Sequence, residues 1–150
     1  MSIDIRRIDP FEYWDEISAL GRRHALELAT NDAWQHIDPK RAAYEAVSAA
    51  GLLYVLGAFD RKTLVGYSVS VRVDHPHLAV TTLTNDLLYL DEDYRNGSAG
   101  LRLMRATEQI ARDLGVNAMI WCAVAGSTLD DILMRRDDYQ AHQRLYRKDL

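Results

Sequence analysis

Apolar positions near the N-terminus follow first a strand spacing and then a helical one. Residues Ile3 to Ile8 alternate imperfectly and predict a short first strand. Asp9-Pro10-Phe11-Glu12 then supplies an N-cap, a proline suited to the first helical turn and a capping-box glutamate, which predicts a helix to about Ala29. Asp38-Pro39 repeats this start, and Gly51 is expected to end a second, alanine-rich helix.

From Leu52 the pattern changes to that of strands. Leu52 to Asp60 is an apolar run, Arg61-Lys62 predicts a hairpin turn, and Thr63 to Val73 alternates with valines and a tyrosine on one face. Asp74-His75-Pro76-His77 predicts the next turn, and Ala79 to Leu90 is expected to return as the following strand.

The last third of the chain alternates helix and strand. An amphipathic helix is predicted to follow Arg95 to Gly100 and to stop at Gly115. Val116 to Val124 predicts a buried strand, Ser127 to Arg136 a short helix, and Tyr139 to Lys148 a final strand. This order predicts an α/β protein with a mixed sheet flanked by helices.

Composition is consistent with one domain over residues 1–150. Hydrophobic residues make up 48% of the chain, enough for one substantial core. The longest apolar runs fall well short of the roughly 18 residues needed to span a bilayer, and no signal-peptide pattern begins the chain, so we expect no membrane association and a cytoplasmic location. The net charge of −4 argues against a general nucleic-acid binder.

The single cysteine, Cys122, lies in an apolar, strand-like run and is interpreted as a core residue. A nucleophilic role is the less favoured alternative, because a reactive thiolate needs exposure and an electropositive partner. No third ligand accompanies His75 and His77 at a useful spacing, so we predict no metal site.

The stretch from Arg95 to Gly100 predicts an anion site. The first N–H groups of a helix lack intrahelical partners and lie at the positive end of its dipole. Arg95 adds a forked cation, and Gly97, Ala99 and Gly100 let a bulky diphosphate approach the backbone closely. The structural alternative is an ordinary loop whose helix start requires small residues.

These residues resemble the signature of the GNAT superfamily of acyl-CoA-dependent N-acyltransferases, which is Q/R-x-x-G-x-G/A at the head of a helix. Arg95, Asn96, Gly97, Ser98, Ala99 and Gly100 occupy its positions in order, with Ser98 in place of the first motif glycine. Upstream, Asp86 to Leu90 is similar to the acidic-x-L-Y-V run of the family's fourth strand. The resemblance implies a GNAT fold with a mostly antiparallel sheet.

The resemblance also implies an activity, namely transfer of an acetyl group from acetyl-CoA to a primary amine. Main-chain groups of Leu88, Tyr89 and Leu90 would bind the pantetheine arm, residues 95–100 would bind the diphosphate, and Ser127 falls near the family's asparagine. These residues do not identify the acceptor amine, which can belong to a small molecule or to a protein lysine or N-terminus. They also leave open whether the protein forms a homodimer. The chain also shows a faint similarity to small phage-encoded GNAT proteins, but this similarity does not indicate a substrate.

Asp86 is the first candidate for a general base or an ammonium anchor, because it matches the family's acidic position and shares strand parity with Leu88 and Leu90. Its alternative is a strand-end aspartate without a chemical role. His77 is a second candidate, since a histidine can relay protons near neutral pH, and a solvated turn is its alternative. In the family, a loop such as Thr30 to Ile37 often borders the acceptor site, although Trp34 within it can equally pack the helices together.

The chain departs from the family pattern at the residue that would donate a proton to the leaving thiolate. Met134 stands where many GNAT enzymes carry a tyrosine, and methionine cannot donate a proton. Water, Tyr139 or Tyr146 would have to replace it. Met134 and Ser98 therefore support a rival function, a catalytically inactive GNAT-fold module that binds a partner protein, whereas Arg95 and Gly100 oppose it.

Overall fold

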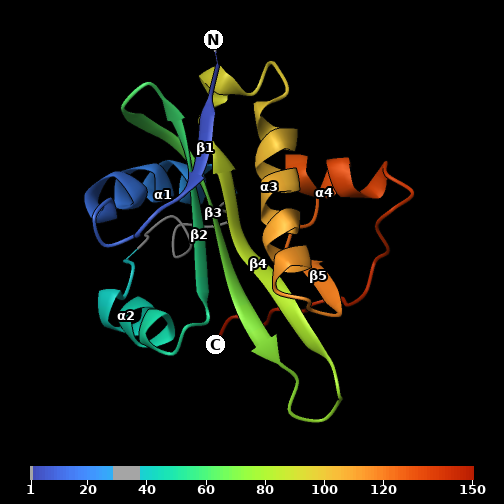
Figure 1. Cartoon of the computed structure of the whole chain (residues 1–150). Coiled ribbons are helices and arrows are strands. Elements are labelled where there is room, and N and C mark those ends of the chain that lie inside the picture. Colours follow the sequence, from blue (N-terminus) through green and yellow to red (C-terminus); the bar gives the residue numbers. More distant parts are fainter. Residues whose placement is uncertain (1, 29–37) are drawn as a thin grey trace.

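One five-stranded sheet organises the computed structural model, which describes residues 2–28 and 38–150 (Figure 1). The strands lie in chain order, β1 to β5, and only the β4–β5 pair is parallel. The strands and helices are β1 (Asp4–Arg7), α1 (Trp14–Leu28), α2 (Arg41–Ala49), β2 (Leu53–Asp60), β3 (Thr63–Asp74), β4 (Thr81–Leu90), the 3₁₀ turn η2 (Glu92–Tyr94), α3 (Ala99–Asp113), β5 (Ala118–Trp121) and α4 (Thr128–Met134). The predicted α/β class, with a mixed and mostly antiparallel sheet, is confirmed.

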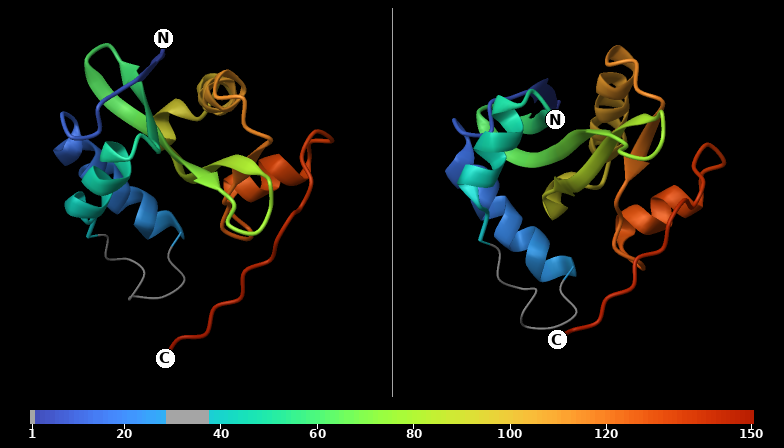
Figure 2. Two further views of the ribbon diagram at one scale, coloured as in Figure 1. Left: turned by 60° about the horizontal axis from the view of Figure 1, so that its bottom comes forward. Right: turned by 90° about the horizontal axis from the view of Figure 1, so that it is seen from below.

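Helices cover both faces of the sheet. On one face, Leu20 of α1 packs with Val55, Tyr67 and Tyr89 of the strands, and Tyr44 of α2 lies against this cluster. α3 lies on the other face, as Figure 2 shows from two sides. It buries the stripe expected from its periodicity. The buried residues of α3 are Ala99, Leu103, Met104, Thr107 and Ala111. The middle strands are therefore buried on both sides.

Local turn chemistry agrees with the sequence at several boundaries. Arg61-Lys62 forms the β2–β3 turn, and Gly51 and Gly115 end α2 and α3 with φ of 71° and 65°, values that favour glycine. The first helix begins later than predicted, at Trp14. The reason is that the Asp9 side chain and carbonyl accept the N–H groups of the next residues in a separate turn.

Two predictions for the C-terminal third are wrong. The strand expected over Val116 to Val124 shortens to Ala118–Trp121 and is only half-buried, and Tyr139 to Lys148 forms no strand. The segment after Tyr139 is exposed throughout, because its charged and apolar residues alternate too weakly to give a buried face. Predictions that fall on Ala29, on the loop from Thr30 to Ile37 and on Trp34 lie outside the described residues.

A β-bulge interrupts β4 at Asp86, the first candidate for a general base. Val69 of β3 is opposite Leu87, whereas the next β3 residue, Ser70, is opposite Asn85, so Asp86 is an extra residue without a partner. The bulge shifts the alternation of side chains by one position. Asp86 consequently does not share parity with Leu88 and Leu90 as predicted. It lies on the α1–α2 face, together with Leu87.

Candidate functional site

β4 and β5 separate halfway along β4. Their parallel pairing ends at Asn85 and Trp121, and a last hydrogen bond joins the Cys122 N–H to the Asn85 carbonyl oxygen at 3.1 Å. β4 continues to Leu90 while pairing only with β3. In the described part of the chain, the second edge of residues 86–90 therefore faces no strand. An extended ligand arm could bind along such an edge through main-chain hydrogen bonds.

The three residues predicted to bind a pantetheine arm lie along this open edge. The side chains of Tyr89 and Leu90 are buried and that of Leu88 is half-buried, so all three also serve the core. The carbonyl oxygen of Leu90 accepts a hydrogen bond from Arg95 Nε at 2.7 Å. Their contact with a cofactor stays a prediction.

The start of α3 lies just beyond this edge and is open. Ser98 is its N-cap residue, and the serine side chain makes no capping hydrogen bond. A Cβ at Gly97 would meet no atom within 4 Å, and one at Gly100 would meet only Leu90 Cδ2 at 4.0 Å. Neither glycine has a positive φ. Because neither the backbone nor the packing requires glycine here, the residues present suit a bulky anion approaching the helix start.

Two of the predicted diphosphate residues have structural partners. The Arg95 guanidinium binds both carboxylate oxygens of Glu27 on α1, at 2.7 and 2.9 Å, and lies over the ring of Tyr89. Its charge is therefore largely balanced within the protein. Ala99 is buried against Leu90 and neighbouring residues, so its side chain belongs to the core. Asn96 is exposed beside Gly97.

Asp86 is exposed at the separation of the two strands. Burial raises the pKa of Tyr44 on α2, and the charge of Asp86 raises it further. Asp86 acts in the same direction on Cys122, whose pKa is raised first by partial desolvation. Cys122 is exposed, so the prediction of a core cysteine is wrong: β5 ends one residue earlier. The raised pKa disfavours a reactive thiolate.

His77 lies elsewhere. It is exposed in the β3–β4 hairpin turn, with its ring edge-on to His75. β4 begins at Thr81, and the five steps from there to Asp86 cover roughly 16 Å. The structure therefore does not bring the two predicted catalytic residues together, and a role for His77 stays a prediction. Among the described residues, no group of three His, Cys, Asp or Glu side chains could hold a metal ion.

The residues predicted around the last helix have structural explanations. The Ser127 hydroxyl caps α4 by accepting the Asp130 N–H at 3.3 Å, while the Asp130 carboxylate accepts the Gly126 N–H. Met134 ends α4 with 71% of its surface exposed. A cofactor contact of Ser127 stays a prediction.

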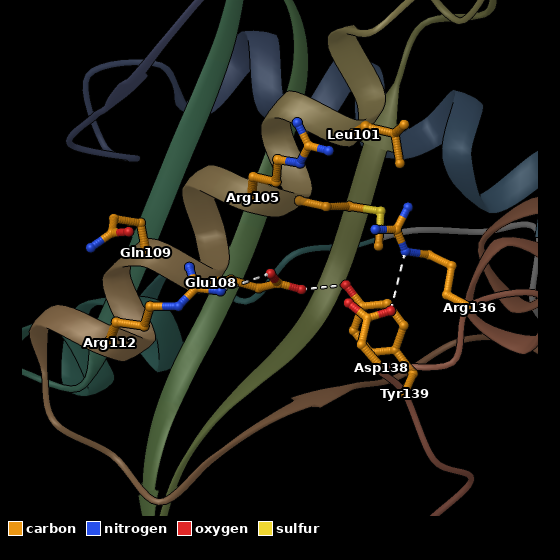
Figure 3. A pocket seen from close by; sticks show the side chains of 9 residues that line it. Leu101, Arg105, Glu108, Gln109, Arg112, Arg136, Asp138 and Tyr139 are labelled. Atoms are coloured by element: carbon orange, nitrogen blue, oxygen red, sulfur yellow. Dashed lines mark hydrogen bonds and ion pairs between the residues drawn. The ribbon is translucent and has the colours of Figure 1, made fainter.

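Tyr139, one of the alternative proton donors, packs on α3 (Figure 3). Its hydroxyl donates a hydrogen bond to Glu108, and burial together with this carboxylate raises the pKa of Tyr139 to about 12. The two residues line a polar cavity of about 390 Å³ that also includes Arg105 and Arg136. This cavity lies on the α3 face, opposite the face that carries Asp86. Tyr146, the other alternative, is 88% exposed.

A second, apolar cavity of about 220 Å³ lies on the α1–α2 face. Trp14, Tyr44, Tyr67 and Leu87 contribute to its walls, and Leu87 is the residue next to Asp86. Sequence reasoning missed this cavity. Its aromatic residues come from three separate elements, and each on its own has the spacing of an ordinary core residue.

Behind this cavity, a 3.0 Å hydrogen bond joins Nδ1 of the buried His24 and the hydroxyl of Tyr67. Its ring also lies 5.1 Å from that of Tyr89, centroid to centroid. Burial lowers the pKa of His24, with Arg95 acting in the same direction and Glu27 against it. The imidazole is therefore held neutral in the folded protein.

We expect His24 to make stability fall on acidification. Between the unfolded pKa, about 6.5, and the lower folded value, the unfolded chain binds more protons, so the free energy of unfolding decreases as pH falls, by at most about 1.4 kcal/mol per pH unit. Urea unfolding from pH 8 to 5 should give a shallower slope for His24→Gln. His142→Gln, in the exposed C-terminal segment, should keep the wild-type slope. Equal slopes for wild type and His24→Gln would contradict this expectation.

Comparison with a family model agrees with the GNAT resemblance of the sequence. The family model described as Acetyltransferase (GNAT) family matches residues 15–132. A search of curated protein sequences finds no significant match. No helix in the described ranges is long and apolar enough to cross a membrane.

Solved structures of similar fold include several acetyltransferases. A ribosomal-protein-alanine N-acetyltransferase from Brucella melitensis biovar Abortus 2308 has a TM-score of 0.75 at 17% identity, with 100% of each chain covered. An aminoglycoside acetyltransferase, meta-AAC0020 from an uncultured soil metagenomic sample, in complex with sisomicin, has 0.74 at 15%, covering 99% of this chain and 95% of that chain. AAC(6')-Iy in complex with the bisubstrate analog CoA-S-monomethyl-acetylneamine has 0.71 at 15%, with both chains fully covered.

At these identities the structural likeness establishes the fold alone. The family model, in contrast, spans most of the chain, including the strand separation and the start of α3. The chain therefore belongs to the GNAT family of acetyltransferases.

Proposed function

We propose that this protein transfers an acetyl group from acetyl-CoA to the primary amine of an acceptor. The observation that carries the proposal is the separation of β4 from β5, whose open edge on β4 leads to Leu90, next to the uncapped start of α3. Family membership supports the reaction class. The CoA bisubstrate analog bound by one structural neighbour supports acetyl-CoA as the donor. The proposal treats residues 1–150 as one acetyltransferase domain and keeps the cytoplasmic location expected from the sequence.

On the donor side, the chain would use its backbone more than its charges. The open edge of residues 86–90 offers main-chain groups to an extended arm. The N–H groups at the start of α3 would bind the diphosphate, with Gly97 and Gly100 leaving room for it. Arg95 would act mainly by fixing the end of β4 to α1, since Glu27 already binds its guanidinium.

On the acceptor side, the amine must be neutral before it can react. Acetyl-CoA would supply a thioester carbonyl, at which the C–N bond forms and the C–S bond breaks, so that CoA leaves as a thiolate and takes a proton from water. Asp86 lies exposed at the strand separation, where its carboxylate can hold an ammonium and accept its proton through a direct contact or one water. Among the described tyrosines, Tyr44 is the one whose raised pKa has the charge of Asp86 among its causes, and the raised pKa keeps its hydroxyl protonated. We assign Tyr44 no donor role.

The direct test is calorimetry with acetyl-CoA followed by an assay of CoA release with added amines. Acetyl-CoA at a hundredfold excess over its Kd should stabilise the protein by about 2.7 kcal/mol, a melting shift of about 5–10 °C for a chain of this size. Absence of binding at millimolar acetyl-CoA would refute the proposal. Binding without acetylation of any amine would instead support the rival function, a GNAT-fold module that binds a partner protein without turnover.

A further inference from the structure

The apolar cavity beside Asp86 carries information about the acceptor. Its floor comes from the central strands, where Val55, Tyr67 and Val69 are at most 3% exposed. Its side walls are Trp14 and Tyr44, whose rings meet edge to face at 5.5 Å. The Tyr67 hydroxyl is already bonded to His24, so that residue offers the cavity mainly its ring.

Few polar groups line this cavity. Asp38 is the one charged residue among the described lining residues, and it is largely exposed at the rim and paired with Lys40. Ser18 and Tyr44 supply the remaining side-chain hydroxyls that are not engaged in the core. A body carrying many hydroxyl or ammonium groups would lose its hydration here without finding partners, at about 1–3 kcal/mol for each group left unpaired. An apolar body has no such cost.

The volume sets a second limit. A cavity of about 220 Å³ holds roughly seven water molecules, which corresponds to about one aromatic ring with a short chain. It is smaller than the roughly 300–1,000 Å³ of typical sites for drug-sized ligands. A molecule of several linked sugar rings cannot enter as a whole.

The position of the cavity orients its occupant. Leu87 lines the wall nearest the strand separation and directly follows Asp86, and Tyr44 on the same side is close enough to be affected by the Asp86 charge. A ligand with its apolar part against Tyr67 and Trp14 would therefore present its other end toward Asp86. A primary amine at that end would meet the carboxylate and, beyond it, the open edge of β4.

We infer that the acceptor is a small primary monoamine with one apolar or aromatic group, of the arylalkylamine class, bound in this cavity with its nitrogen at Asp86. This inference rests on the proposed function. It does not depend on the start of α3, which would bind the donor's diphosphate, because the cavity lies on the opposite side of β4 from α3.

The test compares 2-phenylethylamine with spermidine, sisomicin and an alanine-starting peptide as acceptors, using the full chain and saturating acetyl-CoA. We expect kcat/KM for 2-phenylethylamine to exceed that of each other amine at least a hundredfold. Ser18→Phe, which fills the cavity from α1, should raise KM for 2-phenylethylamine at least tenfold. Ala19→Phe, on the adjacent exposed position of the same helix, should leave KM unchanged.

Binding of 2-phenylethylamine to the protein without acetyl-CoA, measured by calorimetry, provides a readout independent of turnover. It should be detectable for wild type and Ala19→Phe and lost in Ser18→Phe. A protein that acetylates spermidine, sisomicin or the peptide as well as it does 2-phenylethylamine would overturn the inference and leave the proposed function intact. Failure to bind acetyl-CoA would instead remove the proposed function, and absence of 2-phenylethylamine binding would overturn the inference in either case.

Discussion

Replacing Gly100 with aspartate is expected to abolish binding of acetyl-CoA while leaving the free protein at least as stable as wild type. Gly100 is the second residue of α3, and a side chain there meets only ordinary contacts, the nearest being Leu90 Cδ2 at 4.0 Å from the Cβ. Exchanging a helical glycine for aspartate gains only about 0.3 kcal/mol in helix propensity, and an acidic residue in the first turn adds about 0.3–1 kcal/mol through the helix dipole. The same carboxylate repels a diphosphate at the helix start.

The measurement is the melting temperature of wild type and variant with and without acetyl-CoA. Gly100→Asn is the matched control, because it adds nearly the same volume without the charge and should weaken binding less than Gly100→Asp. An unchanged acetyl-CoA shift in Gly100→Asp would exclude the start of α3 as the diphosphate site. A less stable free variant would contradict the packing argument instead.

Replacing Asp86 with asparagine is expected to lower kcat for acetyl transfer by roughly 10² to 10⁴, the range typical for loss of general acid–base catalysis. Affinity for acetyl-CoA should stay nearly unchanged, since the arm would contact main chain. Stability should also hold, because Asp86 is an exposed bulge residue without a strand partner. Binding by calorimetry and turnover by CoA release, measured on the same preparation, separate these effects.

Asp93→Asn serves as the control for a change of one exposed charge in the same region, since Asp93 lies in η2, just after β4. It should turn over at the wild-type rate. Equal rates for wild type and Asp86→Asn would remove Asp86 from the mechanism. Some residual activity in Asp86→Asn is expected, because positioning alone contributes to the rate of a two-substrate reaction.

Local signals in the sequence predicted most of the fold. Arg61-Lys62, Gly51 and Gly115 mark turns and helix ends through backbone preferences of single residues, and the structure has them there. The buried stripe of α3 follows from its periodicity alone. Such features depend on neighbours three or four residues away, which the sequence displays directly.

The errors concern pairings between distant residues. Asp86 lies on the face opposite to the predicted one because a bulge in β4 leaves it unpaired. A second bulge, opposite β2, leaves Val65 of β3 unpaired in the same way. Arg95 was predicted to be available to an anion, yet Glu27 lies 68 residues away in sequence and binds it. The final strand required an apolar face that residues 139–148 do not have. No local pattern encodes these outcomes.

The same dependence on distant residues explains why the sequence predicted only part of the candidate site. Residues 86–90 and 95–100 are contiguous in the chain, so their order alone indicated a strand leading into an anion-binding helix start. The apolar cavity joins Trp14, Tyr44 and Tyr67, which come together only through tertiary packing.

The strand order has a consequence for folding. β2, β3 and β4 are joined by short turns and can pair early, because closing short loops costs little chain entropy. β5 joins them only after residues 91–117 have formed a crossover, and it contributes four pairs to a single neighbour. β1 also makes four pairs to a single neighbour, after a longer connection, so we expect one of the two weakly held edge strands to complete the strand separation late in folding. Subglobal opening of β5 would widen the donor site while the β2–β4 meander stays folded.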